Sequence, residues 1–163
     1  MANNENKKQD ELNLDEKVTV RNIAGWPVGF KRIDGVGEVT IVPEGTTRLS
    51  RNEIISQIQS GNRLFSGVDG NGSHPFVIIE DEPTRKELGF DSEDGTVKQI
   101  VFSDDMVSKL FALKTQNAFE KNFKEAIVTR AEKYAVIQAI KRLKINDYSK
   151  IRFAEEYTGF KLQ

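Results

Sequence analysis

The amino-acid sequence predicts an α+β protein, in which a small antiparallel β-rich N-terminal module precedes a C-terminal module of three to four helices. Apolar residues alternate with polar residues in several short runs before Ser103, whereas after it they recur at three- and four-residue spacing. These are the periods of strands and of helices, respectively. The charge divides at the same place, because residues 1–102 contain 12 basic and 17 acidic residues (−5) and residues 103–163 contain 12 basic and 8 acidic residues (+4).

The composition excludes several classes of function. The 163 residues include no Cys and one His, so the chain has no thiolate nucleophile, no Cys-based zinc or iron–sulfur site and no His pair for catalytic zinc. Its longest apolar runs, such as residues 76–79, are far too short to span a membrane. No signal-peptide pattern opens the sequence, so we expect the protein to remain in the cytoplasm of the cell that makes it. We expect no cofactor, no metal and no membrane partner.

Residues 1–16 are predicted to form a separate N-terminal arm. Apart from Met1 and Ala2, its only apolar residues are Leu12 and Leu14, too few to offset the entropy lost when the arm becomes ordered. We expect the arm to be mobile in the isolated protein. It is either a solvated tail or a peptide that becomes ordered on a partner, with Leu12 and Leu14 as its anchors.

Residues 17–102 are predicted to form the β-rich module. Alternation from Lys17 indicates a first strand, and two further runs separated by turn-forming residues complete a small antiparallel meander. Ser50 and Glu53 have the spacing of a capping box, which predicts a helix to about Ser60, closed by Gly61. The later predictions are strands at residues 64–65 and 76–79, a hairpin turn at 66–73, one helical turn from Thr84 to Gly89, and a possible strand at 97–102.

Residues 103–163 are predicted to form the helical module. Residues that can cap helices precede each apolar stripe: Ser103, Thr115, Thr129 and Asn146-Asp147. Thr129 and Glu132 have capping-box spacing, although this segment can also continue the preceding helix. Gly159 followed by Phe160 is typical of a helix C-terminus.

Three groups of polar residues do not predict a catalytic site. The glycine-rich residues 67–72 precede a strand pattern rather than the helix that a phosphate-binding loop requires, and they lack the later Glu of a calcium loop. His74 has no carboxylate partner that can be recognised in the sequence. Adjacent acidic residues, such as Asp104-Asp105, point in different directions and make poor acid–base pairs. We therefore predict no catalytic, cofactor-binding or metal-binding residues.

Two features are candidates for partner binding. Residues 130–152 contain seven basic and two acidic residues, and Lys141, Arg142 and Lys144 form the densest part of this basic stretch. Such a patch can bind nucleic acid, but no nucleic-acid-binding motif accompanies it, so a solvated or protein-facing surface is favoured. Trp26 lies on a predicted loop and is either a core plug or an exposed contact residue.

Segments at both ends of the folded region resemble a group of small, poorly characterised proteins of tailed bacteriophages. Residues 18–30 (VTVRNIAGWPVGF) are similar to the group's Val-x-Val-Arg-Asn and Val-Gly-Tyr segments, with Phe30 in place of Tyr. Residues 146–154 (NDYSKIRFA) and 158–160 (TGF) resemble its Asn-Asp-x-x-Lys-Arg and Thr-Gly-Phe segments, with Ile151 inserted between Lys and Arg. The resemblance implies a phage origin and a virion protein of the capsid or neck, with no catalytic residues.

The sequence therefore favours a non-enzymatic structural protein of a tailed phage particle, made in the cytoplasm of the bacterial host. We expect it to be oligomeric or bound to a lattice, with capsid, portal or neck proteins as partners. Segregated charge of opposite sign suits contacts between subunits. The alternative is an intracellular nucleic-acid-binding or regulatory protein that uses the basic stretch from Arg130 to Arg152.

Overall fold

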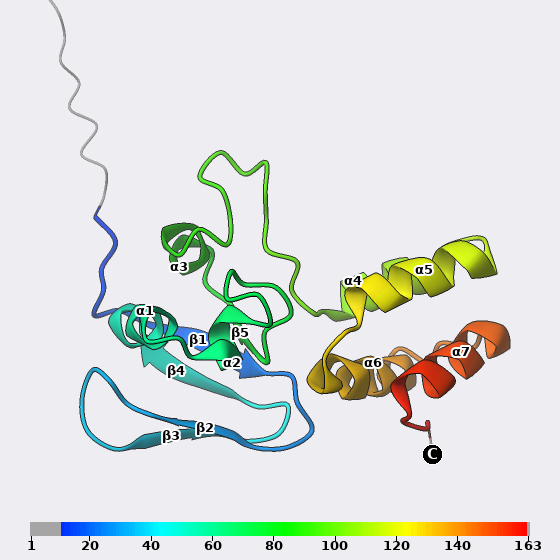
Figure 1. Ribbon diagram of the computed structural model, residues 1–163, viewed down its shortest axis with the longest axis horizontal. Helices are drawn as coiled ribbons and strands as arrows, with labels where there is room; N and C mark the ends of the chain where they lie inside the picture. The colour runs from blue at the N-terminus through cyan, green and yellow to red at the C-terminus, as the bar shows by residue number, and fades with distance from the viewer. Residues whose placement is uncertain (1–10, 163) are drawn as a thin grey trace, which may run out of the picture.

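The structure is a computed structural model that describes residues 11–162. It confirms the α+β class, because five strands and three helices precede Ser103 and four helices follow it. Figure 1 shows the strands on the left and helices α4–α7 on the right. The first group comprises β1 (Lys17–Asn22), β2 (Val28–Lys31), β3 (Glu38–Ile41), β4 (Thr46–Ser50), α1 (Arg51–Gln59), α2 (Arg63–Ser66), β5 (Val77–Ile79) and α3 (Glu82–Glu87). The second comprises α4 (Asp104–Phe111), α5 (Gln116–Ala126), α6 (Arg130–Arg142) and α7 (Tyr148–Thr158).

Strand β1 is the centre of a three-stranded antiparallel sheet in the order β4-β1-β5. Val18 lies opposite Leu49 and Val20 opposite Ile79. Strands β2 and β3 form a separate hairpin, so the predicted three-run meander is wrong. Sequence analysis did not identify β4, because only Leu49 of its five residues is buried and its apolar pattern is weak.

Three further local predictions are corrected. Residues 64–65 lie in helix α2 rather than in a strand, because the Asn62 side chain accepts a hydrogen bond from the backbone N–H of Leu64 (3.1 Å) and starts a helical turn. Residues 66–73 therefore do not join two hairpin strands. Residues 97–102 form no strand within the described chain. Helix α3 is capped by Asp81 rather than Thr84, because the Asp81 side chain accepts from the Thr84 N–H.

The predicted helix caps after Ser103 are confirmed. Ser103, Thr115 and Asp147 each accept a hydrogen bond from the backbone N–H three residues later. Thr129 and Glu132 form a complete capping box that starts α6 as a separate helix, and Gly159 ends α7 in the left-handed conformation. These caps satisfy backbone groups that the helices themselves leave free.

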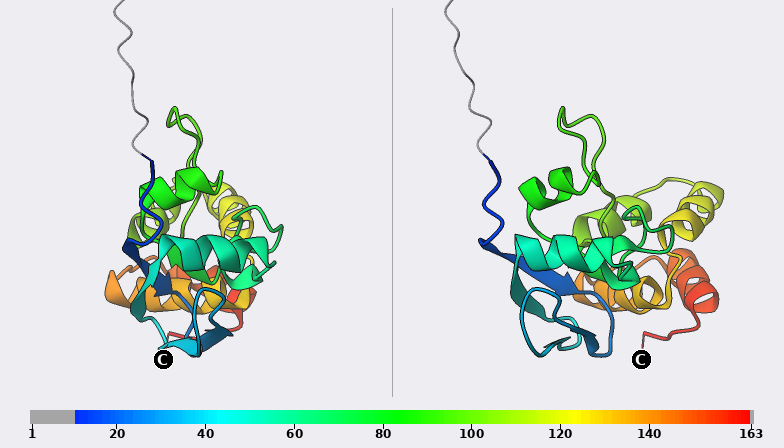
Figure 2. Two further views of the ribbon diagram at one scale, coloured as in Figure 1. Left: turned by 90° about the vertical axis from the view of Figure 1, so that its left-hand side faces the viewer. Right: turned by 60° about the vertical axis from the view of Figure 1, so that its left-hand side comes forward.

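The buried apolar side chains form one cluster that continues from the sheet into the helices. In the helical part, Phe119, Phe123 and Ile127 are fully buried, as their one-turn spacing predicts. Aromatic rings of α4, α5 and α7 pack around them, and Phe153 and Tyr157 stack with centroids 5.9 Å apart. Both views of Figure 2 show α1 against the strands, and the segment after α3 projecting from the body. Across residues 11–162, no helix has the length and apolar character needed to cross a membrane.

Candidate functional site

Residues 18–30, the first segment on which the expected resemblance rests, contain a buried turn at Asn22. Asn22 is fully buried at the end of β1, and its side-chain Nδ2 donates to the carbonyl oxygens of Trp26 (2.9 Å), Val42 (3.1 Å) and Ile41 (3.3 Å). Its Oδ1 accepts from the Ala24 N–H at 2.9 Å. A buried amide whose donors and acceptor are all used fixes a backbone path strongly. Asn22 therefore has a structural role.

Trp26 is held by this turn at the junction between the β-rich part and α6. Its ring packs edge-on against Phe76 and Tyr134, with centroid distances of 6.2 and 6.4 Å. The Arg130 guanidinium lies 5.3 Å from the centroid of the Trp26 ring. Gly25 permits this approach, because a Cβ there would lie 2.4 Å from the Tyr134 ring. Trp26 is partly buried, so it packs against the core on one side and keeps some exposed surface.

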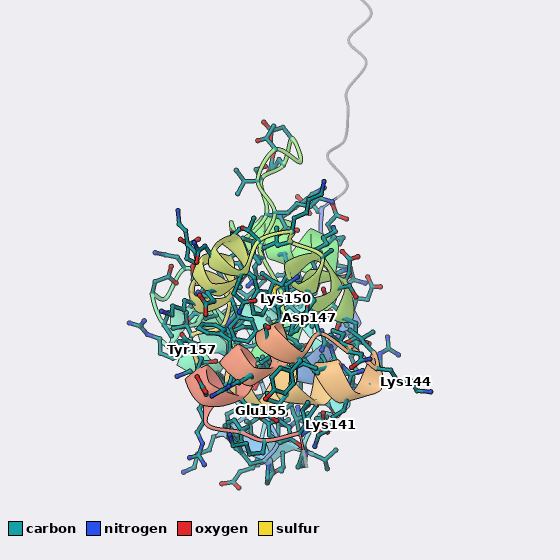
Figure 3. All side chains as sticks on the ribbon, turned by 90° about the vertical axis from the view of Figure 1, so that its right-hand side faces the viewer. Lys141, Lys144, Asp147, Lys150, Glu155 and Tyr157 are labelled. Atoms are coloured by element: carbon teal, nitrogen blue, oxygen red, sulfur yellow. The ribbon has the colours of Figure 1, made fainter. Side chains whose placement is uncertain are left out.

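Residues 146–154, the second such segment, also make structural contacts. Asp147 caps α7, and the Lys150 side chain is buried beneath the helix, where its Nζ donates to the carbonyl oxygens of Phe111 (2.7 Å) and Leu113 (2.6 Å). Lys150 thereby satisfies free carbonyls near the C-terminus of α4, where a cation is favourable. Figure 3 shows Asp147 and Lys150 at the end of α7 that faces the molecule's other helices.

The basic stretch does not form one continuous free cationic surface. Arg142 forms a bidentate ion pair with Asp104, whereas Lys141 and Lys144 are exposed and have no ion pair within residues 11–162. Figure 3 shows Lys144 at the right-hand edge of the molecule and Lys141 nearer its lower middle. The other basic side chains of the stretch have partners of their own: Arg130 with Trp26, Lys133 with Tyr157, Lys150 with backbone carbonyls and Arg152 with Glu156.

Leu12 and Leu14 lie where the arm joins the body. Leu12 is partly buried and Leu14 is 43% exposed. The carbonyl oxygen of Leu14 accepts from the Asn52 N–H (2.9 Å), and that of Glu16 accepts from the Arg51 N–H (3.0 Å). The end of the arm therefore contacts α1 within the same chain, while residues 1–10, for which mobility was also expected, lie outside the described residues.

The β2–β3 hairpin presents an apolar tip that sequence analysis did not identify. Val36 is 97% exposed and Ile33 is 49% exposed. Beneath the tip, the buried Glu53 carboxylate accepts from the backbone N–H groups of Ile33 (2.9 Å) and Asp34 (2.6 Å). Glu53 therefore does not complete the capping box predicted with Ser50. In the sequence, Val36 lies between two glycines in the turn-forming stretch 34–37.

The charge of Glu53 is stabilised by these donors. Burial opposes ionisation of the carboxyl group, but hydrogen bonds from the Asp34 and Ile33 amides and from the Gln57 side chain together lower its pKa below the ordinary value. Gln57 also donates to the Lys31 carbonyl at 2.7 Å. The hairpin is thus tied to α1 by a buried, ionised group that holds the backbone at residues 33 and 34.

His74 also has a partner that sequence analysis could not find. Its Nδ1 lies 2.9 Å from both carboxylate oxygens of Glu132, which is 58 residues away in the chain. Glu132 is 5% exposed and also accepts from the N–H groups of Val128 and Thr129, each at 3.1 Å. The carboxylate therefore joins the loop before β5 to the first turn of α6.

A cavity of about 540 Å³ lies beside this pair and is lined by His74, Phe90, Gln99, Met106 and Glu125, among others. The Oε1 atom of Gln99 is buried without a hydrogen-bond partner. A His–carboxylate pair can orient a general base, but within residues 11–162 His74 has no further hydrogen bond to a nucleophile or second base. No cluster of three or more potential metal ligands occurs in that range.

Comparison of the chain with models of known protein families, with curated proteins and with solved structures finds no match.

Proposed function

We propose that this protein is a non-enzymatic structural component of a tailed-phage particle that binds capsid, portal or neck proteins. The observation that carries the protein-binding role is the apolar tip of the β2–β3 hairpin. Val36 is almost fully exposed there, and the loop is held from below by Glu53 and Gln57. A rigid protruding contact loses less conformational entropy on binding than a flexible one.

The phage assignment is supported by the roles of the resembling residues. Asn22, Asp147, Lys150 and Gly159 stabilise turns and helix ends rather than forming a reactive centre. Residues of this kind preserve a scaffold, so a resemblance through them favours a shared architecture. The function of such a protein resides in its exposed surfaces, and the hairpin tip is one apolar protrusion among them.

The contacts of the basic stretch favour this function over nucleic-acid binding. Five of its seven basic side chains contact rings, carboxylates or backbone carbonyls within the chain. Neutralisation of phosphates along a nucleic acid requires several free cations on one face. Carboxylates or backbone carbonyls engage Arg142, Lys150 and Arg152, which leaves fewer cations of the stretch without an acceptor within residues 11–162.

The test is quantitative mass spectrometry of purified particles from the phage that encodes the chain. We expect the protein at a fixed copy number per particle, and we expect Val36→Asp to reduce its incorporation about tenfold or more, the effect of losing an interface residue worth at least ~1.4 kcal/mol. Val68→Asp is the matched control, because Val68 is also exposed (56%) but lies in another loop. Absence of the protein from particles would refute the proposal, and normal incorporation of Val36→Asp would refute the role of the tip.

A further inference from the structure

A groove between the arm and α3 combines an apolar floor with an acidic rim. Its volume is about 680 Å³. Leu12, Leu14 and Pro83 supply the apolar surface, and Glu87 and Glu93 lie at its edge, together with Glu11. None of these three carboxylates has an ion-pair partner within residues 11–162, whereas Lys86, the one basic residue lining the groove, is paired with Glu82 at 3.0 Å. The groove therefore suits a partner that is both cationic and partly apolar.

The turn between α6 and α7 has the complementary character. Lys141 and Lys144 are exposed, and Tyr148, the first residue of α7, is 76% exposed. The exposed Tyr148 follows the two lysines in the sequence and offers an apolar ring with a polar tip, and Tyr is enriched at protein contacts. We call Lys141, Lys144 and Tyr148 the basic turn.

Lys144 occupies a backbone position that ordinarily favours glycine. Its φ is 53°, its N–H donates to the Lys141 carbonyl, and the N–H of Ile145 donates to the Ile140 carbonyl (both 3.2 Å). This is the left-handed residue that ends a helix, where a side chain costs conformational energy that glycine avoids. The side chain of Lys144 can therefore be removed without loss of the turn, which separates its charge from its effect on folding.

We propose that the acidic groove binds the basic turn of a second copy of this chain. In this contact, three carboxylates face two lysines, all of them without an ion pair within residues 11–162, and the Tyr148 ring meets Leu12, Leu14 and Pro83. The two surfaces are different parts of the molecule, so the contact is head-to-tail, and its repetition gives a ring or an open chain of subunits. This inference is independent of the proposed place in a phage particle, because it concerns the purified protein alone.

The proposed contact is small and mainly electrostatic, so its affinity must be measured at more than one salt concentration. An interface below about 1,200 Å² is typical of weak association, and unlike charges at an exposed rim are screened by salt within about 10 Å at 0.1 M ionic strength. We expect the full-length protein to self-associate with a dissociation constant of about 10–100 μM at low salt, and at least tenfold more weakly near 0.5 M salt. Sedimentation velocity over a range of protein concentrations measures both.

Charge exchange identifies the two surfaces. Glu87→Lys/Glu93→Lys makes the groove basic, and Lys141→Glu/Lys144→Glu makes the turn acidic. Each double variant alone should associate at least tenfold more weakly than the wild type, whereas an equimolar mixture should associate, because each groove then meets a turn of opposite charge. Lys114→Glu/Lys121→Glu is the control for net charge, because both lysines are exposed on other parts of the helical module and their change should leave association intact.

Lys144→Gly separates folding from association. This variant should unfold at a urea concentration equal to or higher than the wild type, while its self-association weakens about threefold or more through loss of one charge. A wild-type protein that stays monomeric at low salt and high concentration would overturn the proposal. So would a mixture of the two double variants that associates no better than either variant alone.

Discussion

Replacement of Glu132 by Ala tests whether one buried carboxylate holds the two parts of the protein together. In the wild type this side chain accepts from the amides of Val128 and Thr129 and contacts Nδ1 of His74. The substitution removes half of the capping box and the contact with the loop before β5. The other half, in which Thr129 Oγ1 accepts from the backbone N–H of residue 132, remains.

The magnitude follows from the groups left without a partner. The Thr129 cap itself remains, and each buried donor left unsatisfied costs about 1–3 kcal/mol. Because Val128 is 43% exposed, water replaces the carboxylate at that amide, and the main penalties fall at Thr129 and His74. We expect a total loss of about 2–4 kcal/mol in the free energy of unfolding.

Urea denaturation followed by circular dichroism at neutral pH measures this loss as a lower midpoint with an unchanged slope. Glu125→Ala is the matched control, because Glu125 lines the same cavity but is exposed and has no ion pair within the described chain. A double-mutant cycle with His74→Ala should give a coupling of about 1 kcal/mol or more. A loss for Glu132→Ala below about 0.5 kcal/mol, or one equal to that of Glu125→Ala, would show that the carboxylate is not a structural tie.

Three further changes test other parts of the fold. The pKa of Glu53 is lower in the folded protein than its ordinary value of 4.5. The stability advantage of the wild type over Glu53→Gln should therefore be complete above pH 4.5 and shrink as the pH falls through the folded pKa. Urea midpoints of the two proteins, measured at several pH values, should converge in acid, and a constant difference would contradict this role of Glu53. Gly25→Ala should destabilise the protein by about 1–3 kcal/mol through overlap with the Tyr134 ring, and Tyr134→Leu should reduce that penalty in thermal denaturation; an unchanged penalty means that the overlap is not its cause. Lys150→Met keeps the apolar stem of the side chain but leaves two carbonyls at the end of α4 without their donor. It should therefore lower the urea midpoint by an amount equivalent to about 1–3 kcal/mol. An unchanged midpoint would show that water satisfies these carbonyls equally well.

Much of the helical part was predictable because its determinants are local. Ser103 and Thr129 each accept from an amide three residues away, and this interaction depends only on residue type and spacing. Phe119 and Phe123 are one turn apart and both are fully buried. Periodicity and capping chemistry therefore gave the right helices, whereas the two-residue run at 64–65 was too short to distinguish a strand from a helix.

The candidate surfaces were only partly predictable. Lys141 and Lys144 were identified from charge density alone, but nothing in the sequence indicated that Arg142 beside them is bound to Asp104. The sequence did not indicate where Trp26 packs, because its contact with Tyr134 joins distant parts of the chain. The hairpin tip was missed because exposure of an apolar residue depends on what surrounds it in space.

The sequence by itself determined the α+β class, the all-helical character of the chain after Ser103, and most of the helix caps there, while it left open whether Thr129 starts a new helix. Only the tertiary structure decided that β1 pairs with β4 and β5, that Glu53 holds a hairpin rather than completing a cap, and that His74 meets Glu132. The physical reason is the separation of the interacting residues along the chain. Helix caps and the apolar faces of helices arise from residues within four positions of one another. Strand partners and buried ion pairs depend on which distant segments the common core brings together.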